Sequence, residues 1–236
     1  MHDPAALRAR LDDVRERIAR AAGRAGRDPS SVKLVAVSKT FTAEDVRAVA
    51  EAGQVDFGEN KIQEAGPKID ATRDLPIRWH LIGHLQSNKA RKAAAAFAMI
   101  HSVDSLALAE RLESMAGAAA RPIELLVQVD LAGEPAKHGA TEDELWPIFV
   151  AARHWRTARL VGLMLLPPAV DEPEHARPYF QALERVRQRL LTRGADGSML
   201  AEKSMGMSHD FEVAVEEGAT LIRVGTAIFG RRPSPP

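Results

Sequence analysis

Residues 33–39, with the sequence KLVAVSK, decide the fold, because they form a short apolar run that is closed by Lys39. A run of this kind, without polar alternation, is typical of a parallel strand that is buried on both faces. The segment from Thr42 to Ala52, which follows at once, has the pattern of a helix. This succession predicts the first unit of an alternating α/β fold.

The rest of the chain repeats the alternation. A helix within residues 1–27 comes first, where Asp3 has the pattern of an N-cap and Pro4 that of a first helical position. The predicted strands are Lys33–Ser38, Gln54–Phe57, Ile77–Ile82, Ala98–Val103, Ile123–Val129, Leu160–Leu165, Met199–Ser204 and Thr220–Val224. The predicted helices between them are Ala43–Ala52, Lys61–Ala71, Ser87–Ala96, Ser105–Ala118, Thr141–Arg153, Pro173–Arg193 and Phe211–Glu217.

Eight strands joined by helices predict a single (β/α)8 TIM-type barrel with an extra N-terminal helix. We expect one domain over residues 1–236 and a flexible, proline-rich tail at 231–236. Because the chain ends shortly after the last strand, we expect no second domain. The alternative is an open doubly wound sheet, which would bind ligands at a switch-point crevice instead.

Composition excludes several classes of function. Lys plus Arg and Asp plus Glu number 32 each, so no net charge favours nucleic acid or a membrane surface. Cysteine is absent, which excludes disulfides and thiolate chemistry. No apolar signal core or membrane-spanning run occurs. We therefore expect a cytoplasmic protein that binds neither nucleic acid nor membranes.

The last two predicted strands lead into segments suited to an anion. Gly206, Ser208, Gly225 and Thr226 offer backbone N–H groups and hydroxyls where a loop meets a helix. Helix amino ends attract phosphate, and the loops after strands seven and eight of this barrel often hold one. These residues either form a phosphate site or are simply turns at the strand ends. Neither GxxxxGKS nor GxGxxG occurs, so those nucleotide-binding loops are not predicted.

Closure of a barrel places strand eight beside strand one, and hence Arg223 beside Lys39. A lysine at a strand end either extends its charge to solvent or, when buried, becomes a nucleophilic amine of lowered pKa. With a phosphate site nearby, the second reading suits pyridoxal 5'-phosphate (PLP), a phosphorylated aldehyde, held as a Schiff base. Arg223 either faces the ring nitrogen, which it would keep unprotonated, or pairs with a helix glutamate.

Five motifs resemble the YggS/PROSC family of pyridoxal phosphate homeostasis proteins, and the likeness runs from Lys33 to Gly230. They are VAVSKT (35–40), FGEN-x-x-QE (57–64), WHLIGHLQSNK (79–89), SMGMSHDFE (204–212) and IRVGTAIFG (222–230). The resemblance implies a barrel similar to the amino-terminal domain of alanine racemase, with PLP carried on a lysine. Two departures are Phe41-Thr42, where members often have a second lysine and a proline, and Lys203, where leucine usually stands.

The resemblance also implies a set of binding residues. Lys39 matches the Schiff-base lysine, and Lys137 matches a lysine suspected in release or transfer of the cofactor. The other positions that match the family's cofactor site are Asn60, His80, Ser204, Ser208, Arg223, Gly225 and Thr226. We accordingly expect a monomer that controls intracellular PLP, hands it transiently to apo-enzymes and is not itself an enzyme.

Two enzymatic alternatives stay open. An amino-acid racemase of the same fold needs an acid or base on each face of the imine. The single tyrosine, Tyr179, falls on a helix expected outside the barrel, and we expect no counterpart of the second domain of alanine racemase. A phosphosugar aldolase or isomerase would use a lysine imine on a strand such as the sixth, whereas Lys39 follows the first.

No metal site is predicted. His80 and His84 lie four apart, but on a strand and its following loop and without the carboxylate of an HExxH motif. His209-Asp210 is expected instead to cap the helix Phe211–Glu217, because an aspartate stabilises a helix amino end.

Overall fold

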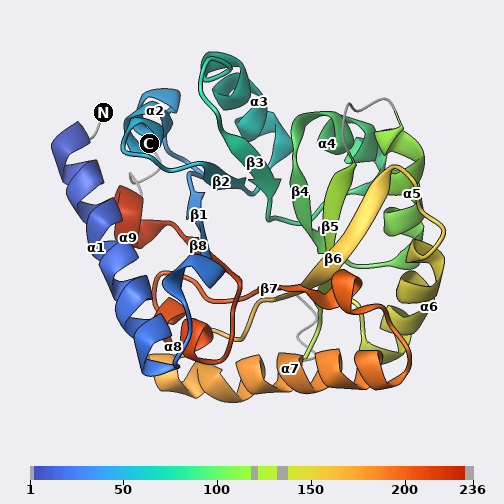
Figure 1. The fold of residues 1–236 in the computed structure, drawn as a ribbon. Coiled ribbons are helices and arrows are strands. Elements are labelled where there is room, and N and C mark those ends of the chain that lie inside the picture. Colours follow the sequence, from blue (N-terminus) through green and yellow to red (C-terminus); the bar gives the residue numbers. More distant parts are fainter. Residues whose placement is uncertain (1–2, 118–121, 132–137, 232–236) are drawn as a thin grey trace.

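Eight parallel strands close into a barrel in sequence order in this computed structural model, which describes residues 3–117, 122–131 and 138–231 (Figure 1). Closure joins β8 to β1, with Val35 opposite Arg223. The strands are β1 (Lys33–Val37), β2 (Asp56–Glu59), β3 (Arg78–Leu81), β4 (Met99–Val103), β5 (Ile123–Val129), β6 (Ala158–Leu165), β7 (Glu202–Ser204) and β8 (Leu221–Val224). The predicted barrel is confirmed, and the open sheet is wrong.

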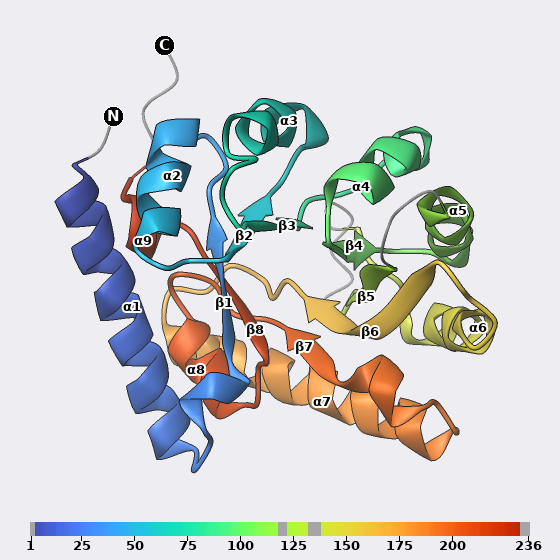
Figure 2. The same ribbon diagram turned by 45° about the horizontal axis from the view of Figure 1, so that its top comes forward.

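Helices surround the barrel (Figures 1 and 2). The α-helices are α1 (Pro4–Arg24), α2 (Ala43–Glu51), α3 (Ile62–Ala71), α4 (Ala90–Ala96), α5 (Leu106–Ala116), α6 (Glu142–Ala152), α7 (Arg177–Thr192), α8 (Phe211–Glu216) and α9 (Thr226–Phe229). Short 3-10 turns occur at η1 (Pro29–Ser31), η2 (Ser87–Lys89), η3 (Pro173–Ala176) and η4 (Gly197–Leu200). None of the helices described is long and apolar enough to cross a bilayer.

The N-terminal helix α1 lies against the outside of the barrel, where it packs on α2, α8 and α9. Its first turn forms as predicted, since the Asp3 carboxylate accepts a hydrogen bond of 3.0 Å from the N–H of Ala5, and Pro4 follows Asp3. Leu7, Leu11 and other apolar residues of one face are buried, which fixes the helix on its neighbours.

Two apolar layers explain why the strands lack polar alternation. Val35 of β1 belongs to a small cluster inside the barrel, together with residues such as Met99 and Leu221. Its neighbours Leu34 and Ala36 belong to the larger cluster between the strands and the helices. Successive side chains of a strand point to opposite faces, so both faces of β1 are buried.

The seventh strand is shorter than predicted. The sequence suggested Met199–Ser204, but β7 begins at Glu202 because η4 occupies the preceding residues. The Asp196 carboxylate accepts a hydrogen bond of 2.8 Å from the N–H of Ser198 and so starts this turn. An aspartate that caps a turn in this way competes with the extended conformation.

Candidate cofactor-binding site

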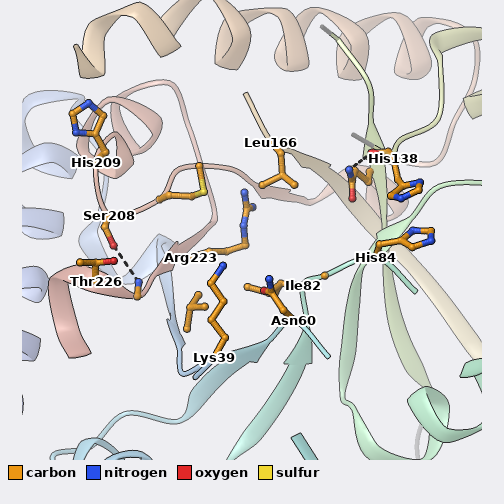
Figure 3. Close-up of a pocket in the computed structure, with 15 residues that line it drawn as sticks. Lys39, Asn60, Ile82, His84, His138, Leu166, Ser208, His209, Arg223 and Thr226 are labelled. Carbon is orange, nitrogen blue, oxygen red and sulfur yellow. Dashed lines mark hydrogen bonds between the residues drawn. The ribbon is translucent and has the colours of Figure 1, made fainter. Parts of the chain in front are cut away.

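A cavity of about 450 Å³ opens at the carboxyl ends of the strands, which is a volume typical of small-molecule sites. It brings together most of the residues that the sequence singled out. Those that line it are Lys39, Asn60, Ser208, Arg223, Gly225 and Thr226 (Figure 3). Lys137 lies outside the described residues.

Lys39 is half-buried and lies in a turn, separated from the end of β1 by Ser38. In Figure 3 its side chain points into the cavity, with the amine toward Arg223. The next residue, Thr40, has a φ of 70°, which is uncommon for a residue other than glycine and costs on the order of 1 kcal/mol. The chain therefore turns away sharply after Lys39.

A buried ion pair supports the backbone just before Lys39. Lys68 on α3 donates hydrogen bonds of 2.7 Å to the Ser38 carbonyl and 2.6 Å to Glu59 Oε1. The Ser38 hydroxyl also donates to Glu59 Oε1, at 2.7 Å. Glu59 is completely buried and Lys68 nearly so, so the end of β1 is held in one position.

The loops after β7 and β8 meet at Ser208, where the sequence suggested an anion cradle. Ser208 Oγ accepts a hydrogen bond of 3.1 Å from the backbone N–H of Gly225 (Figure 3) and one of 3.3 Å from that of Ala227. Gly206 has a φ of +89°, and a Cβ there would lie 2.5 Å from the Cβ of Ala214. Because Ser208 Oγ accepts both of these bonds, its hydroxyl hydrogen is left to donate to a ligand oxygen, so the residues fit a phosphorylated ligand.

Asp210 does not act as predicted. It occupies the N-cap position of α8 but makes no side-chain hydrogen bond to that helix. Its carboxylate accepts from the N–H of Met207 at 2.6 Å instead, within the loop that carries Ser208. Burial raises the pKa of Asp210 above its usual value. The predicted cap is therefore wrong, and Asp210 instead holds the cradle loop in shape.

Arg223 is buried among neutral partners at the floor of the cavity. Its Nη1 donates to Ser204 Oγ at 2.6 Å and its Nη2 to the Leu165 carbonyl at 2.8 Å. Burial lowers the pKa of Arg223 to about 10, so the guanidinium still carries its charge at neutral pH. The alternative of a pair with a helix glutamate is wrong.

Ser204 and His80 are fully buried and do not line the cavity. They belong to a chain of hydrogen bonds that also includes His101 and Asp56, two residues that the sequence analysis missed. The signal was present, because His101 interrupts an apolar strand, and a buried polar side chain of this kind needs partners. Which partners it finds depends on how the strands are staggered around the barrel.

His101 predicts a pH dependence of stability. Burial, together with His80 and Arg223, lowers its pKa well below 6.5. Below pH 6.5 the His101 side chain binds a proton in the unfolded chain but stays neutral in the folded chain. The free energy of unfolding therefore falls as the pH drops below 6.5. The slope expected from this residue approaches 1.4 kcal/mol per pH unit. Denaturant unfolding at pH 7.5 and 5.5 measures how much the free energy of unfolding changes between these two pH values. This change should be smaller in His101→Gln than in the unchanged chain, and an equal change would contradict the assignment.

Two histidines stack at the mouth of the cavity. The rings of His84 and His138 lie 3.6 Å apart at 14°, and His84 Nδ1 is 3.3 Å from Asp104 Oδ2. The three side chains are close enough to hold a metal ion. An imidazole binds a metal in its own plane, however, and two nearly parallel planes cannot share one ion. The arrangement found is therefore a stacked pair with a carboxylate, and the absence of a metal stays a prediction.

Tyr179 lies away from the cavity. It is on α7, where it packs against the outer apolar cluster between strands and helices. It does not line the cavity. The tyrosine hydroxyl is therefore not placed to transfer a proton to a ligand beside Lys39.

Comparison with known proteins places this geometry among relatives. The family described as "Alanine racemase, N-terminal domain" matches residues 9–233. The pyridoxal phosphate homeostasis protein of Aquifex aeolicus (strain VF5) is 40% identical over 223 residues, covering 94% of this chain and 97% of the relative. The protein of that name from Pseudomonas aeruginosa is 44% identical over 221 residues, covering 93% of each.

Solved structures agree in fold. The PipY protein of Synechococcus elongatus PCC7942, solved with PLP bound, superimposes with a TM-score of 0.84 at 40% identity, covering 95% of this chain and all of that one. Alanine racemase from Corynebacterium glutamicum has a TM-score of 0.74 at 19% identity, and the match covers 97% of this chain but 62% of the racemase. The second likeness is one of fold alone.

Proposed function

This chain belongs to the family of pyridoxal phosphate homeostasis proteins, and on that premise we propose that it carries PLP bound covalently to Lys39. The observation that carries the proposal is the shared cavity, which Lys39, Arg223 and the Ser208 cradle all line. A phosphorylated aldehyde with a ring nitrogen needs an amine, an anion site and a donor, and these three groups supply them.

Each residue then has a role that its contacts allow. The amine of Lys39 would condense with the aldehyde, whose oxygen leaves as water, and hydrolysis by water would reverse the attachment. Ser208, Gly225 and Thr226 hold the phosphate, and Arg223 donates to the ring nitrogen. Asn60 lies beside Lys39 at the cavity wall. Ser204 and His80 act through Arg223, because neither lines the cavity.

We propose carriage rather than turnover as the activity. Racemisation needs a second acid or base opposite the lysine, and Tyr179 is remote from the cavity. The protein would act as a cytoplasmic monomer that passes PLP to apo-enzymes. Deuterium exchange at Cα of amino acids tests turnover, and rapid exchange would favour the racemase.

The test of the proposal is covalent trapping. The purified chain is incubated with PLP, its visible absorbance is recorded, and borohydride is added before mass analysis and peptide mapping. We expect an absorbance band with PLP and one reduced adduct on the peptide that contains Lys39. A phosphosugar in place of PLP should give no adduct; a sugar adduct without a PLP adduct would favour an aldolase.

Removal of the cradle hydroxyl should weaken binding without ending it. We expect Ser208→Ala to bind PLP about tenfold less tightly, because one hydrogen-bonding group at a charged ligand is worth roughly 1.5 kcal/mol. Equilibrium dialysis measures the dissociation constant. Ser198→Ala, at an exposed serine of η4, is the matched control and should bind as the unchanged chain does. Equal affinity of the two variants would remove Ser208 from the site.

A further inference from the structure

A chain of hydrogen bonds crosses the barrel from the cavity to the opposite rim. Arg223 is bonded to Ser204 at 2.6 Å, and Ser204 to His101 Nδ1 at 2.8 Å. His101 Nε2 is 2.9 Å from His80 Nδ1, and His80 Nε2 is 2.9 Å from Asp56 Oδ1. The members come from five strands, and Asp56 begins β2 at the amino-terminal rim. Ser204, His101 and His80 have no exposed surface.

The chemistry of the groups fixes the direction of these bonds. A guanidinium has no acceptor atom, so Arg223 donates to Ser204. The Ser204 hydroxyl then needs an acceptor for its own hydrogen, which His101 Nδ1 provides. His101 consequently carries its hydrogen on Nε2 and donates to His80, whose Nε2–H donates to the Asp56 carboxylate. Ser204, His101 and His80 thereby each donate to an acceptor.

The opposite direction satisfies the groups less well. It requires a doubly protonated His80 that donates to His101 through Nδ1, so that His101 donates to Ser204. The Ser204 hydroxyl hydrogen would then lack an acceptor within the described part of the chain. Two pKa shifts agree with the first arrangement. Burial lowers the pKa of His101, which stays neutral. Although burial opposes it, the hydrogen bond from His80 and the charges of Arg78 and Lys33 lower the pKa of Asp56, which is therefore ionised.

We propose that this chain of hydrogen bonds from Arg223 to Asp56, the relay, holds Arg223 as a charged donor toward the ring nitrogen of PLP. Asp56 is then a positioning residue for a cofactor that it does not touch. The inference rests on the role proposed above for Arg223. In the relay every lone pair points toward the guanidinium and every hydrogen toward the carboxylate. Aligned hydrogen bonds of this kind polarise one another in a medium of low dielectric. The charge of Asp56 thus partly neutralises Arg223 across the barrel.

The relay has a consequence for the ring nitrogen. When the carboxylate charge is removed, the guanidinium is less neutralised and becomes a stronger donor. Asp56→Asn keeps the shape and an acceptor oxygen but loses the charge. Glu124→Gln is the matched control, because Glu124 lies on the same rim and pairs at 3.1 Å with Arg78, which is also 3.6 Å from Asp56. It does not belong to the relay.

The first experiment uses the unloaded protein and is independent of PLP. Long-range proton–nitrogen correlation spectra of the uniformly nitrogen-15-labelled chain report which ring nitrogens carry hydrogen. We expect His80 and His101 to be neutral at pH 7, each with its hydrogen on Nε2. A doubly protonated His80, or a hydrogen on Nδ1 of His101, would overturn the relay.

The second experiment uses PLP labelled with nitrogen-15 in the ring. We expect the ring resonance of the loaded protein to move upfield in Asp56→Asn, by at least about twice its movement in Glu124→Gln. His101→Gln, which can accept through Oε1 and donate through Nε2, should leave the resonance near that of the unchanged chain, whereas His101→Leu should move it.

The outcomes separate the two proposals. Equal movements in Asp56→Asn and Glu124→Gln, or none, would overturn the relay while PLP binding stands. Failure of the unchanged chain to bind labelled PLP would overturn the proposed function, and the histidine spectra would still show whether the relay exists. Thermal unfolding of each variant checks that the barrel is intact before loading.

Discussion

Lys39→Ala is expected to lose covalent carriage of PLP completely. Alanine has no amine to bond with the aldehyde carbon, and no other group can replace a carbon–nitrogen bond. The visible absorbance of the bound cofactor and the borohydride-stable adduct should both disappear. The cavity and the cradle persist in this variant, so some noncovalent binding through the phosphate should remain detectable by dialysis.

Lys39→Arg and Lys89→Ala sharpen this test. Arginine retains the charge at position 39, but its guanidinium stays protonated and does not form the bond, so this variant should fail as alanine does. Lys89 is a half-buried lysine of η2 and does not line the cavity. Lys89→Ala should keep the full adduct. A full adduct in Lys39→Ala would show that another amine carries the cofactor.

The neighbours of Lys39 could be predicted because the barrel is closed. Once the eight strands are recognised, the pairing of β1 with β8 follows, and so does the proximity of Lys39 and Arg223. The glycine and serine residues of the cradle could be located in the same way, because they follow the predicted strands seven and eight. These inferences need only the order of the elements.

The polar interior could not be predicted in this way. Whether His101 meets His80 or another strand depends on the stagger of the strands, which the order of elements does not specify. Asp210 shows a second limit, since it occupies the N-cap position of α8 but its carboxylate accepts from the N–H of Met207 in the preceding loop. Local sequence patterns identify the polar groups that need hydrogen-bond partners, whereas the tertiary structure determines which partners they find.

The buried pair of Lys68 and Glu59 was not predicted either, and its disruption should have the largest effect on stability. Lys68→Met leaves the Glu59 charge buried without its partner, and the Ser38 carbonyl loses a donor. We expect the free energy of unfolding to fall by about 3–5 kcal/mol, as is usual when one member of a buried ion pair is removed. Chemical denaturation measures this change.

Lys61→Met is the matched control, because Lys61 precedes the same helix and pairs at 3.3 Å with Glu64 in an exposed position. Exposed pairs of this kind contribute about 0–1 kcal/mol, so this variant should unfold almost as the unchanged chain does. Similar losses in Lys61→Met and Lys68→Met would show that burial does not govern the effect.

The double variant Glu59→Leu/Lys68→Met then distinguishes the effect of an unpaired buried charge from the effect of losing the donor that holds the backbone before Lys39. Glu59 Oε2 is buried and has no hydrogen-bond partner among the residues that the structure describes, so the native pair does not fully compensate its own desolvation. Removing both charges should therefore recover most of the stability that Lys68→Met loses. Adduct formation should recover less, because Ser38 still lacks the donor that fixes the backbone before Lys39. If the free energy of unfolding and the amount of adduct recovered to the same extent, Lys68 would stabilise the barrel without positioning the amine of Lys39.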